Sequence, residues 1–139
     1  MKSILIISLL LSAFFASCQI QWGQSSNWTL YKCEGYRVFA IPIDSLKSYD
    51  SSPFNQDSIA YFVKSAKVFN TKASLAWMGG YVATCKLDGA LRKVEISNYG
   101  GYFYDEKTSA YYKLPIEKID AWLSFIQDSY LTLVKKNSH

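Results

Sequence analysis

The chain has 139 residues and a formal net charge of +4, from 15 basic and 11 acidic side chains. Its longest basic runs are the pairs Arg92-Lys93 and Lys135-Lys136, so the sequence lacks the concentrated positive charge that nucleic-acid binding requires. The length suits one domain better than two, and an aromatic content of 17% supplies large side chains for its core.

Residues 1 to 18 have the layout of a secretory signal peptide. Lys2 precedes an unbroken apolar run, and small residues follow before Cys18. The run is shorter than the about 20 apolar residues that a membrane-spanning helix needs. The alternative is a buried N-terminal helix, but such a helix would show a polar stripe, and only Ser8 and Ser12 interrupt the run.

The end of this segment, Phe15-Ala16-Ser17-Cys18, resembles a bacterial lipobox. In a lipobox the cysteine after the small residues receives diacylglycerol and becomes the new N-terminus; leucine is the usual residue where Phe15 stands. The alternative is ordinary signal peptidase cleavage after Cys18, which would release a secreted protein. We favour lipid attachment at Cys18.

Removing the first 18 of the 139 residues leaves 121 and, with Lys2 lost, lowers the formal charge from +4 to +3. Residues 19 to 27 are polar apart from Ile20 and Trp22, which predicts a short tether. Residues 28 to 139 are then expected to form a single domain.

Two cysteines remain after the signal segment, Cys33 and Cys85. Exported proteins meet an oxidising environment, so an even pair of this kind predicts a Cys33–Cys85 disulfide. The alternative is a pair of buried free thiols. Their spacing contains no Cys-x-x-Cys and no neighbouring histidine, so we expect no zinc site.

The first strands are expected near the start of the domain. Residues 28 to 31 and 36 to 41 are rich in β-favouring side chains and flank Cys33-Glu34-Gly35, which predicts a hairpin. Residues 43 to 57 are rich in serine and aspartate and predict a loop, with Leu46 as its candidate for the core.

Residues 58 to 69 leave two interpretations open. They fit a short helix capped by Asp57 or Ser58. They also fit a pair of strands, because the pattern of apolar residues does not distinguish the period of a helix from that of a strand.

The centre of the chain predicts two further hairpins. Residues 75 to 87 and 90 to 99 flank Asp88-Gly89, which is among the strongest short hairpin signals. The second hairpin consists of residues 102 to 104 and 110 to 114 around the polar turn at 105 to 109.

Pro115 is expected to open a C-terminal helix, because proline is tolerated at the first helical position. Apolar residues then recur at steps of three and four, which predicts an amphipathic helix. They are Ile116, Ile119, Leu123, Ile126, Tyr130, Leu133 and Val134. The predicted fold class is therefore α+β, an antiparallel β-meander packed against this C-terminal helix.

The sequence offers little catalytic chemistry. Its only histidine is His139, the last residue, so it contains neither a positioned histidine base nor a serine–histidine or cysteine–histidine pair. Its carboxylates are scattered, and no glycine-rich phosphate-binding motif occurs. We therefore expect a protein that is not an enzyme and has no cofactor or metal site.

Residues 98 to 113 concentrate aromatic side chains in one predicted hairpin, together with Gly100-Gly101. Strand alternation sends neighbouring side chains to opposite faces, so some of these rings should be exposed. Tyrosine is enriched in recognition surfaces; the alternative is ordinary packing on the sheet. The candidate anchors are Tyr99, Tyr102, Tyr104 and Tyr112, with Asp105 and Glu106 at the rim.

A lipobox-like signal, a short tether and a small α+β domain without a catalytic set resemble the small envelope lipoproteins of Gram-negative bacteria. Within that class, the chain is similar in build to immunity lipoproteins and enzyme inhibitors. The resemblance implies a periplasmic protein, held at the membrane only by its lipid, that docks onto a toxin or enzyme. Acidic rim residues would favour a basic partner. The alternatives are a structural lipoprotein of an envelope complex and a secreted eukaryotic protein of unknown activity.

Overall fold

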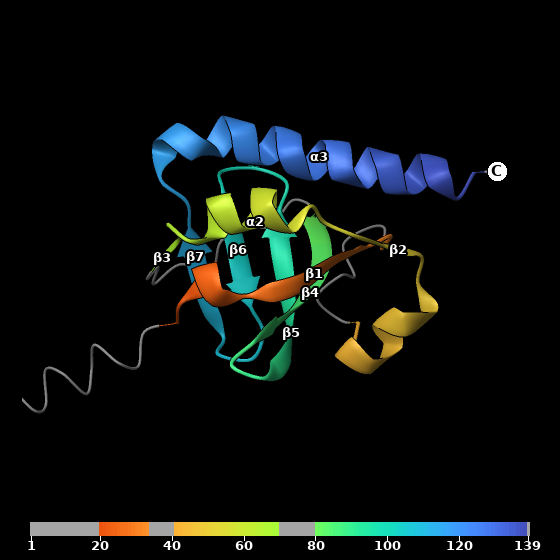
Figure 1. Cartoon of the computed structure of the whole chain (residues 1–139), viewed down its shortest axis with the longest axis horizontal. Coiled ribbons are helices and arrows are strands. Elements are labelled where there is room, and N and C mark those ends of the chain that lie inside the picture. Colours follow the sequence, from red (N-terminus) through yellow and green to blue (C-terminus); the bar gives the residue numbers. More distant parts are fainter. Residues whose placement is uncertain (1–19, 34–40, 70–79, 139) are drawn as a thin grey trace, which may run out of the picture.

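The structure is a computed structural model that describes residues 20–33, 41–69 and 80–138 (Figure 1). In these residues, antiparallel strands form one sheet in the order β2-β1-β4-β5-β6-β7-β3. The strands are β1 (Ser26–Tyr31), β2 (Ser51–Pro53), β3 (Lys67–Val68), β4 (Gly80–Leu87), β5 (Ala90–Ser97), β6 (Tyr102–Asp105) and β7 (Ala110–Lys113). The helices are η1 (Trp22–Gln24), η3 (Ile43–Ser48), α2 (Gln56–Val63), η4 (Ile116–Lys118) and α3 (Ile119–Lys136). The predicted α+β class is confirmed.

Strands β4 to β7 form the predicted meander, each paired with the next. Asp88 and Gly89 connect β4 to β5 with φ angles of 53° and 74°. Positive φ at both central residues is the conformation that twists in the same sense as the flanking strands. Both predicted hairpins are confirmed for the described residues; positions 75 to 79 of the first expected strand lie outside them.

Helices α2 and α3 lie against one face of the sheet (Figure 1) and share a core with it. Trp122, Ile126 and Leu133 are the buried residues of α3. The Trp122 ring contacts Phe62 of α2 and Phe103 of β6, with centroid separations of 5.4 Å and 6.5 Å. The C-terminal helix is thus part of the core, as the periodicity predicted.

The predicted stripe is correct at Ile126 and Leu133, which are buried, but it differs from the buried one at Leu123 and Ile116. Leu123 is only partly buried, and its neighbour Trp122 takes the central position. Ile116 is 81% exposed, because it lies in η4 before α3 begins at Ile119. Trp122 and Leu123 are adjacent large apolar residues, and periodicity alone did not show which of them faces the core.

The predicted tether is wrong for most of its length. Trp22 lies in η1 and is buried. Its ring meets those of Phe103 and Tyr112 edge-on, with centroid separations of 5.2 Å in both cases. Strand β1 then begins at Ser26, so the residues around Trp22 belong to the domain.

The segment between β1 and β4 contains both helix and strand. Leu46 in η3 is buried, as predicted. Of the two interpretations of residues 58 to 69, the helix is observed in α2, followed by the short strand β3. The N-cap of α2 is Asn55, whose side chain accepts a hydrogen bond from the Ser58 backbone N–H. The predicted caps, Asp57 and Ser58, were therefore placed two or three residues too late.

Strand β1 has a neighbour on each side. Thr29, Leu30 and Tyr31 pair with β2 on one side and with β4 on the other. The strand expected at residues 36 to 41 lies outside the described residues apart from Ile41. Along these three residues, β2 and β4 are thus the two neighbours of β1.

The predicted disulfide is not formed, and Cys33 and Cys85 are both buried free thiols. Cys85 belongs to the core under the helices, whereas Cys33 packs with Leu46 and Val82 in a smaller cluster. Val82 and Cys85 are three residues apart on β4 and so project from opposite faces of the sheet. The sheet lies between the two thiols. Burial raises the pKa of both, that of Cys85 to about 12.

Candidate docking surface

The predicted site residues are divided between the two faces of the sheet. On β6, Phe103 and Asp105 are buried on the helical face, and Tyr102 and Tyr104 alternate to the other face. Tyr112 on β7 is buried and stacks on Phe103, with a centroid separation of 5.3 Å. The prediction that Tyr112 anchors a partner is therefore wrong; its ring is part of the core.

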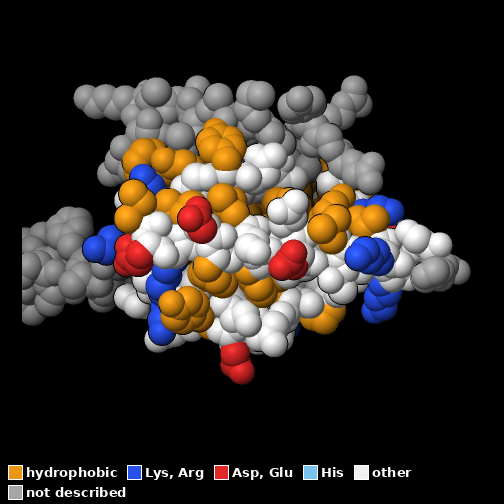
Figure 2. Space-filling model, turned by 90° about the horizontal axis from the view of Figure 1, so that it is seen from above, with side chains coloured by type: hydrophobic (Ala, Val, Ile, Leu, Met, Phe, Trp, Pro, Cys, Tyr) orange, Lys and Arg blue, Asp and Glu red, His pale blue; other side chains and the backbone are white. Residues whose placement is uncertain are grey.

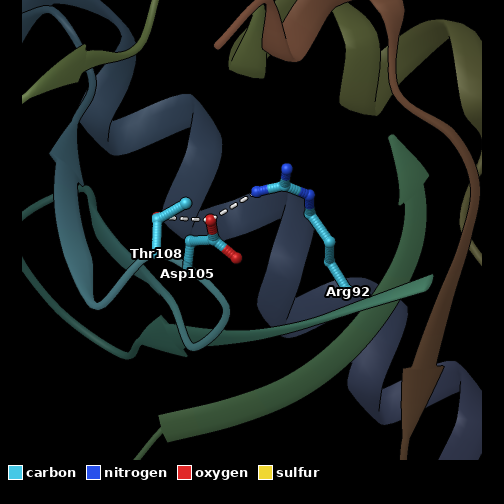
Figure 3. Close-up of polar contacts among 3 residues, drawn as sticks. All are labelled: Arg92, Asp105 and Thr108. Carbon is cyan, nitrogen blue, oxygen red and sulfur yellow. Dashed lines mark hydrogen bonds and ion pairs between the residues drawn. The ribbon is translucent and has the colours of Figure 1, made fainter. Parts of the chain in front are cut away.

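Asp105 is also in the core, with 0% of its surface exposed. Its Oδ2 accepts hydrogen bonds from Arg92 Nη1 at 2.6 Å and from Thr108 Oγ1 at 2.5 Å (Figure 3). The Arg92 guanidinium also lies 6.0 Å from the centre of the Trp22 ring. The prediction that Asp105 lies on a solvated rim is wrong, because the pairing of β5 with β6 turns its carboxylate toward a buried arginine.

A second polar cluster lies on the opposite face of the sheet. Lys93 Nζ is 2.9 Å from Glu106 Oε2 and 3.4 Å from Glu95 Oε1, and it donates a hydrogen bond to the Ile41 carbonyl at 2.6 Å. Burial raises the pKa of Glu95 to about 7; Lys93 lowers it, and Glu106 raises it further. Glu106, with 45% of its side chain exposed, is at the surface as predicted, but its charge is paired with Lys93.

Tyr104 extends this cluster across the sheet. The strand registers place Glu95 opposite Tyr104, and Tyr104 opposite Tyr111. The two tyrosine rings have a centroid separation of 4.7 Å. Burial raises the pKa of Tyr111, with smaller contributions from Tyr104 and Glu95. Tyr104 is thus a member of a cross-strand pair and only partly accessible.

Tyr99 and Tyr102 lie together with a residue that the sequence did not single out. The Tyr102 ring is 6.5 Å from Tyr99 and 5.2 Å from Phe69, measured between centroids. Lys113 Nζ lies 5.3 Å from the centre of the Tyr102 ring and 5.6 Å from that of Phe69. We call Phe69, Tyr102, Tyr99 and Lys113 the aromatic ladder.

The turn before β6 shapes this ladder. Gly100 and Gly101 have φ angles of 69° and 68°, a region that side chains disfavour. A Cβ atom on Gly100 would lie 2.5 Å from Cε2 of Tyr102. These glycines therefore permit the bend before β6, and the missing side chain of Gly100 makes room for the Tyr102 ring.

Phe69 was missed because it follows a strand of only two residues, β3. Its backbone N–H donates to the Tyr111 carbonyl at 2.8 Å, which brings its ring to the edge of the sheet beside Tyr102. An apolar residue at position 69 was visible in the sequence. The pairing of β3 with β7 spans more than 40 positions of the chain, and no local pattern signals it.

Other kinds of site find little support in the described parts of the chain. Residues 20–33, 41–69 and 80–138 contain no cluster of three or more histidine, cysteine, aspartate or glutamate side chains suited to a metal ion. No helix in the same ranges is long and apolar enough to cross a membrane. On the side of α3, Figure 2 shows hydrophobic side chains interspersed with both acidic and basic ones. That face therefore presents mixed charge.

No protein-family model, curated protein sequence or solved structure matches this chain.

Proposed function

We propose that this chain is an envelope-anchored binding protein, an immunity protein or inhibitor that neutralises a toxin or enzyme by docking directly onto it. The observation that carries the proposal is the aromatic ladder. Tyr99 is 37% exposed, Tyr102 and Phe69 are partly exposed, and Lys113 lies over two of the rings. Partly exposed aromatic side chains in a defined arrangement are typical of residues that dominate binding energy.

The ladder replaces the wider surface expected from the sequence. Tyr112 and Asp105 are buried, so Tyr99, Tyr102 and the partly accessible Tyr104 remain of the predicted anchors. Tyr104 lies outside the ladder, in a pair with Tyr111. The preference for a basic partner rested on Asp105 and Glu106. Both carboxylates have basic partners within the chain, which removes that argument.

The envelope anchor is supported by the signal-like first 18 residues and the thiol of Cys18 at their end. Growth of a bacterial host with a clickable fatty acid tests it. We expect label on the wild-type protein, and none on Cys18→Ala, which should also remain uncleaved or misrouted. An unlabelled wild-type protein would contradict the anchor and favour secretion.

Docking is tested by purifying the full chain from its own envelope and identifying stoichiometric protein partners. We expect a partner to be recovered with the wild type and lost with Tyr102→Ala. Tyr61→Ala is the matched control, because Tyr61 is 51% exposed on α2, away from the ladder. Melting curves should show that both variants fold. Equal recovery with Tyr102→Ala would contradict docking through the ladder.

A further inference from the structure

Strand β3 is the last strand at one edge of the sheet described here. Lys67 pairs with Lys113, and Val68 pairs with Tyr112. The next residue, Phe69, donates its N–H to Tyr111. Hydrogen-bonded and non-hydrogen-bonded pairs alternate along antiparallel strands. The backbone N–H and C=O of Val68 therefore point away from β7, toward the side of β3 that has no partner strand among the described residues.

A hollow lies on each side of this edge strand. The hollow on the helical side has a volume of about 610 Å³ and is lined mainly by small and apolar groups, among them Ile20, Ala66, Val68 and Tyr112. The hollow on the ladder side has a volume of about 260 Å³. Its lining includes Lys67, Phe69 and Lys113.

Two hollows at one edge match the geometry of an added strand. Successive side chains of a strand point to opposite faces. A residue paired directly with Val68 would therefore direct its side chain into the larger hollow, and its two neighbours would point toward the ladder. Main-chain hydrogen bonds supply affinity in this mode of recognition, and pockets for alternate side chains supply specificity.

The charge of the lining indicates the chemistry of the added strand. Among the described residues that line the two hollows, the charged ones are Lys67 and Lys113, and both are basic. Val68 is 57% exposed between them. Carboxylates on the ladder side of an incoming strand would lie near the two ammonium groups, and an apolar side chain would suit the other hollow.

We propose that the β3 edge binds an extended segment of the partner protein as an additional antiparallel or parallel strand, with acidic side chains facing Lys67 and Lys113 and an apolar side chain in the larger hollow. The inference rests on the proposed function, because its occupant is a protein partner. It adds the mode of binding and the chemistry of the segment that binds.

The probe is an acetylated and amidated heptapeptide in which glutamate alternates with valine, carrying a fluorescent label. The control peptide has lysine in place of glutamate. Binding to the full mature chain in detergent is measured by fluorescence anisotropy. We expect the glutamate peptide to bind more tightly than the lysine peptide; equal binding of the two would overturn the proposal.

A backbone variant separates strand addition from simple charge attraction. Val68→Pro removes the outward N–H while leaving the inward hydrogen bond of Phe69 in place, and proline is tolerated on an edge strand when its missing N–H faces solvent. The substitution should lower the affinity for the glutamate peptide by about tenfold, the effect expected of one lost hydrogen bond. Val68→Thr keeps the N–H and should bind like the wild type. Unchanged binding by Val68→Pro would overturn the proposal.

The native partner distinguishes this proposal from the proposed function. If a partner co-purifies with the wild type and is lost with Tyr102→Ala but not with Val68→Pro, docking stands and strand addition is contradicted. If the partner is lost with both variants, strand addition is supported. If the wild type recovers no partner, the proposed function fails, and the inference that depends on it fails too.

Discussion

The two faces of the sheet each hold a buried ion pair, but the pairs have different surroundings. On the helical face, Arg92 and Asp105 are buried next to the Trp22 ring of the main core, with Thr108 as a further donor to Asp105. On the opposite face, Lys93 bridges Glu95 and the partly exposed Glu106. The first pair is enclosed, whereas the second reaches toward solvent through one of its members.

This contrast arises from two adjacent residues. Arg92 and Lys93 read in the sequence as a small basic run, yet neighbouring positions of β5 point to opposite faces and enter separate clusters. A buried ion pair is costly to break, because removal of one partner leaves an uncompensated charge. Loss of an acidic group should therefore have different consequences on the two faces.

The largest loss of stability is expected from the ion pair on the helical face. Asp105→Ala leaves the Arg92 guanidinium buried without its carboxylate, and should lower the free energy of unfolding by about 3 to 5 kcal/mol. Glu106→Ala removes a partly exposed partner of Lys93 and should cost no more than about 1 kcal/mol. Urea unfolding measures both. Equal losses would show that the two faces do not differ in this way.

The apolar contacts of the helical face provide the next comparison. Ile126→Ala should lower the free energy of unfolding by about 2 to 5 kcal/mol, because its side chain is buried between α3 and the sheet. Leu123→Ala should cost clearly less, since Leu123 is only partly buried. Thermal melts of the two variants test the observed orientation of α3, and a larger loss for Leu123→Ala would contradict it.

The second cluster should make stability depend on pH. The pKa of Glu95 is raised from 4.5 to about 7, so between these values the unfolded chain releases a proton that the folded chain keeps. The stabilisation that comes from the Glu95 proton is fully present below a pH of 4.5, decreases as the pH rises toward 7 and is lost above it. The loss amounts to about 3 kcal/mol, from the free energy equivalent of the pKa difference.

Glu95→Gln should remove this dependence. Urea unfolding at about pH 5 and about pH 8 would show the variant gaining stability relative to wild type at the higher pH. Asp128→Asn is the matched control, because Asp128 is exposed on α3 and away from Lys93. Parallel pH profiles for wild type and Glu95→Gln would mean that Glu95 is not the responsible group.

The smallest effect is expected at the start of the C-terminal segment. Ile116→Ser should change the free energy of unfolding by no more than about 0.5 kcal/mol, because the side chain is 81% exposed. Leu114→Ser, at a buried position two residues earlier, should be strongly destabilising. Thermal melts of the two variants test where the core ends, and a large loss of stability for Ile116→Ser would place Ile116 in the core.

The parts of the fold that were predictable have local signals. Asp88-Gly89 specifies its own turn, and apolar periodicity indicates α3. Features that depend on pairing between distant strands were not predictable. Asp105 looked like a turn residue because nothing near it in the sequence shows that β6 will turn it toward Arg92.

The candidate site shows the same limit. Tyr99 and Tyr102 could be selected because they flank two glycines in an aromatic hairpin. The burial of Tyr112 depends on which face of β7 meets the helices, and the place of Phe69 depends on the pairing of β3 with β7. The disulfide was predicted from the expected compartment and the even number of cysteines. Neither of these indicates from which face of the sheet a thiol projects.

The placement of the two thiols has a kinetic consequence. A bond between Cys33 and Cys85 is incompatible with a sheet that separates them, because disulfide geometry requires close approach of the two Cβ atoms. In the unfolded chain the same thiols meet freely. For an exported protein, folding and thiol oxidation are then competing reactions. A chain that folds first shields both sulfurs, whereas one oxidised first must be reduced before its sheet can close.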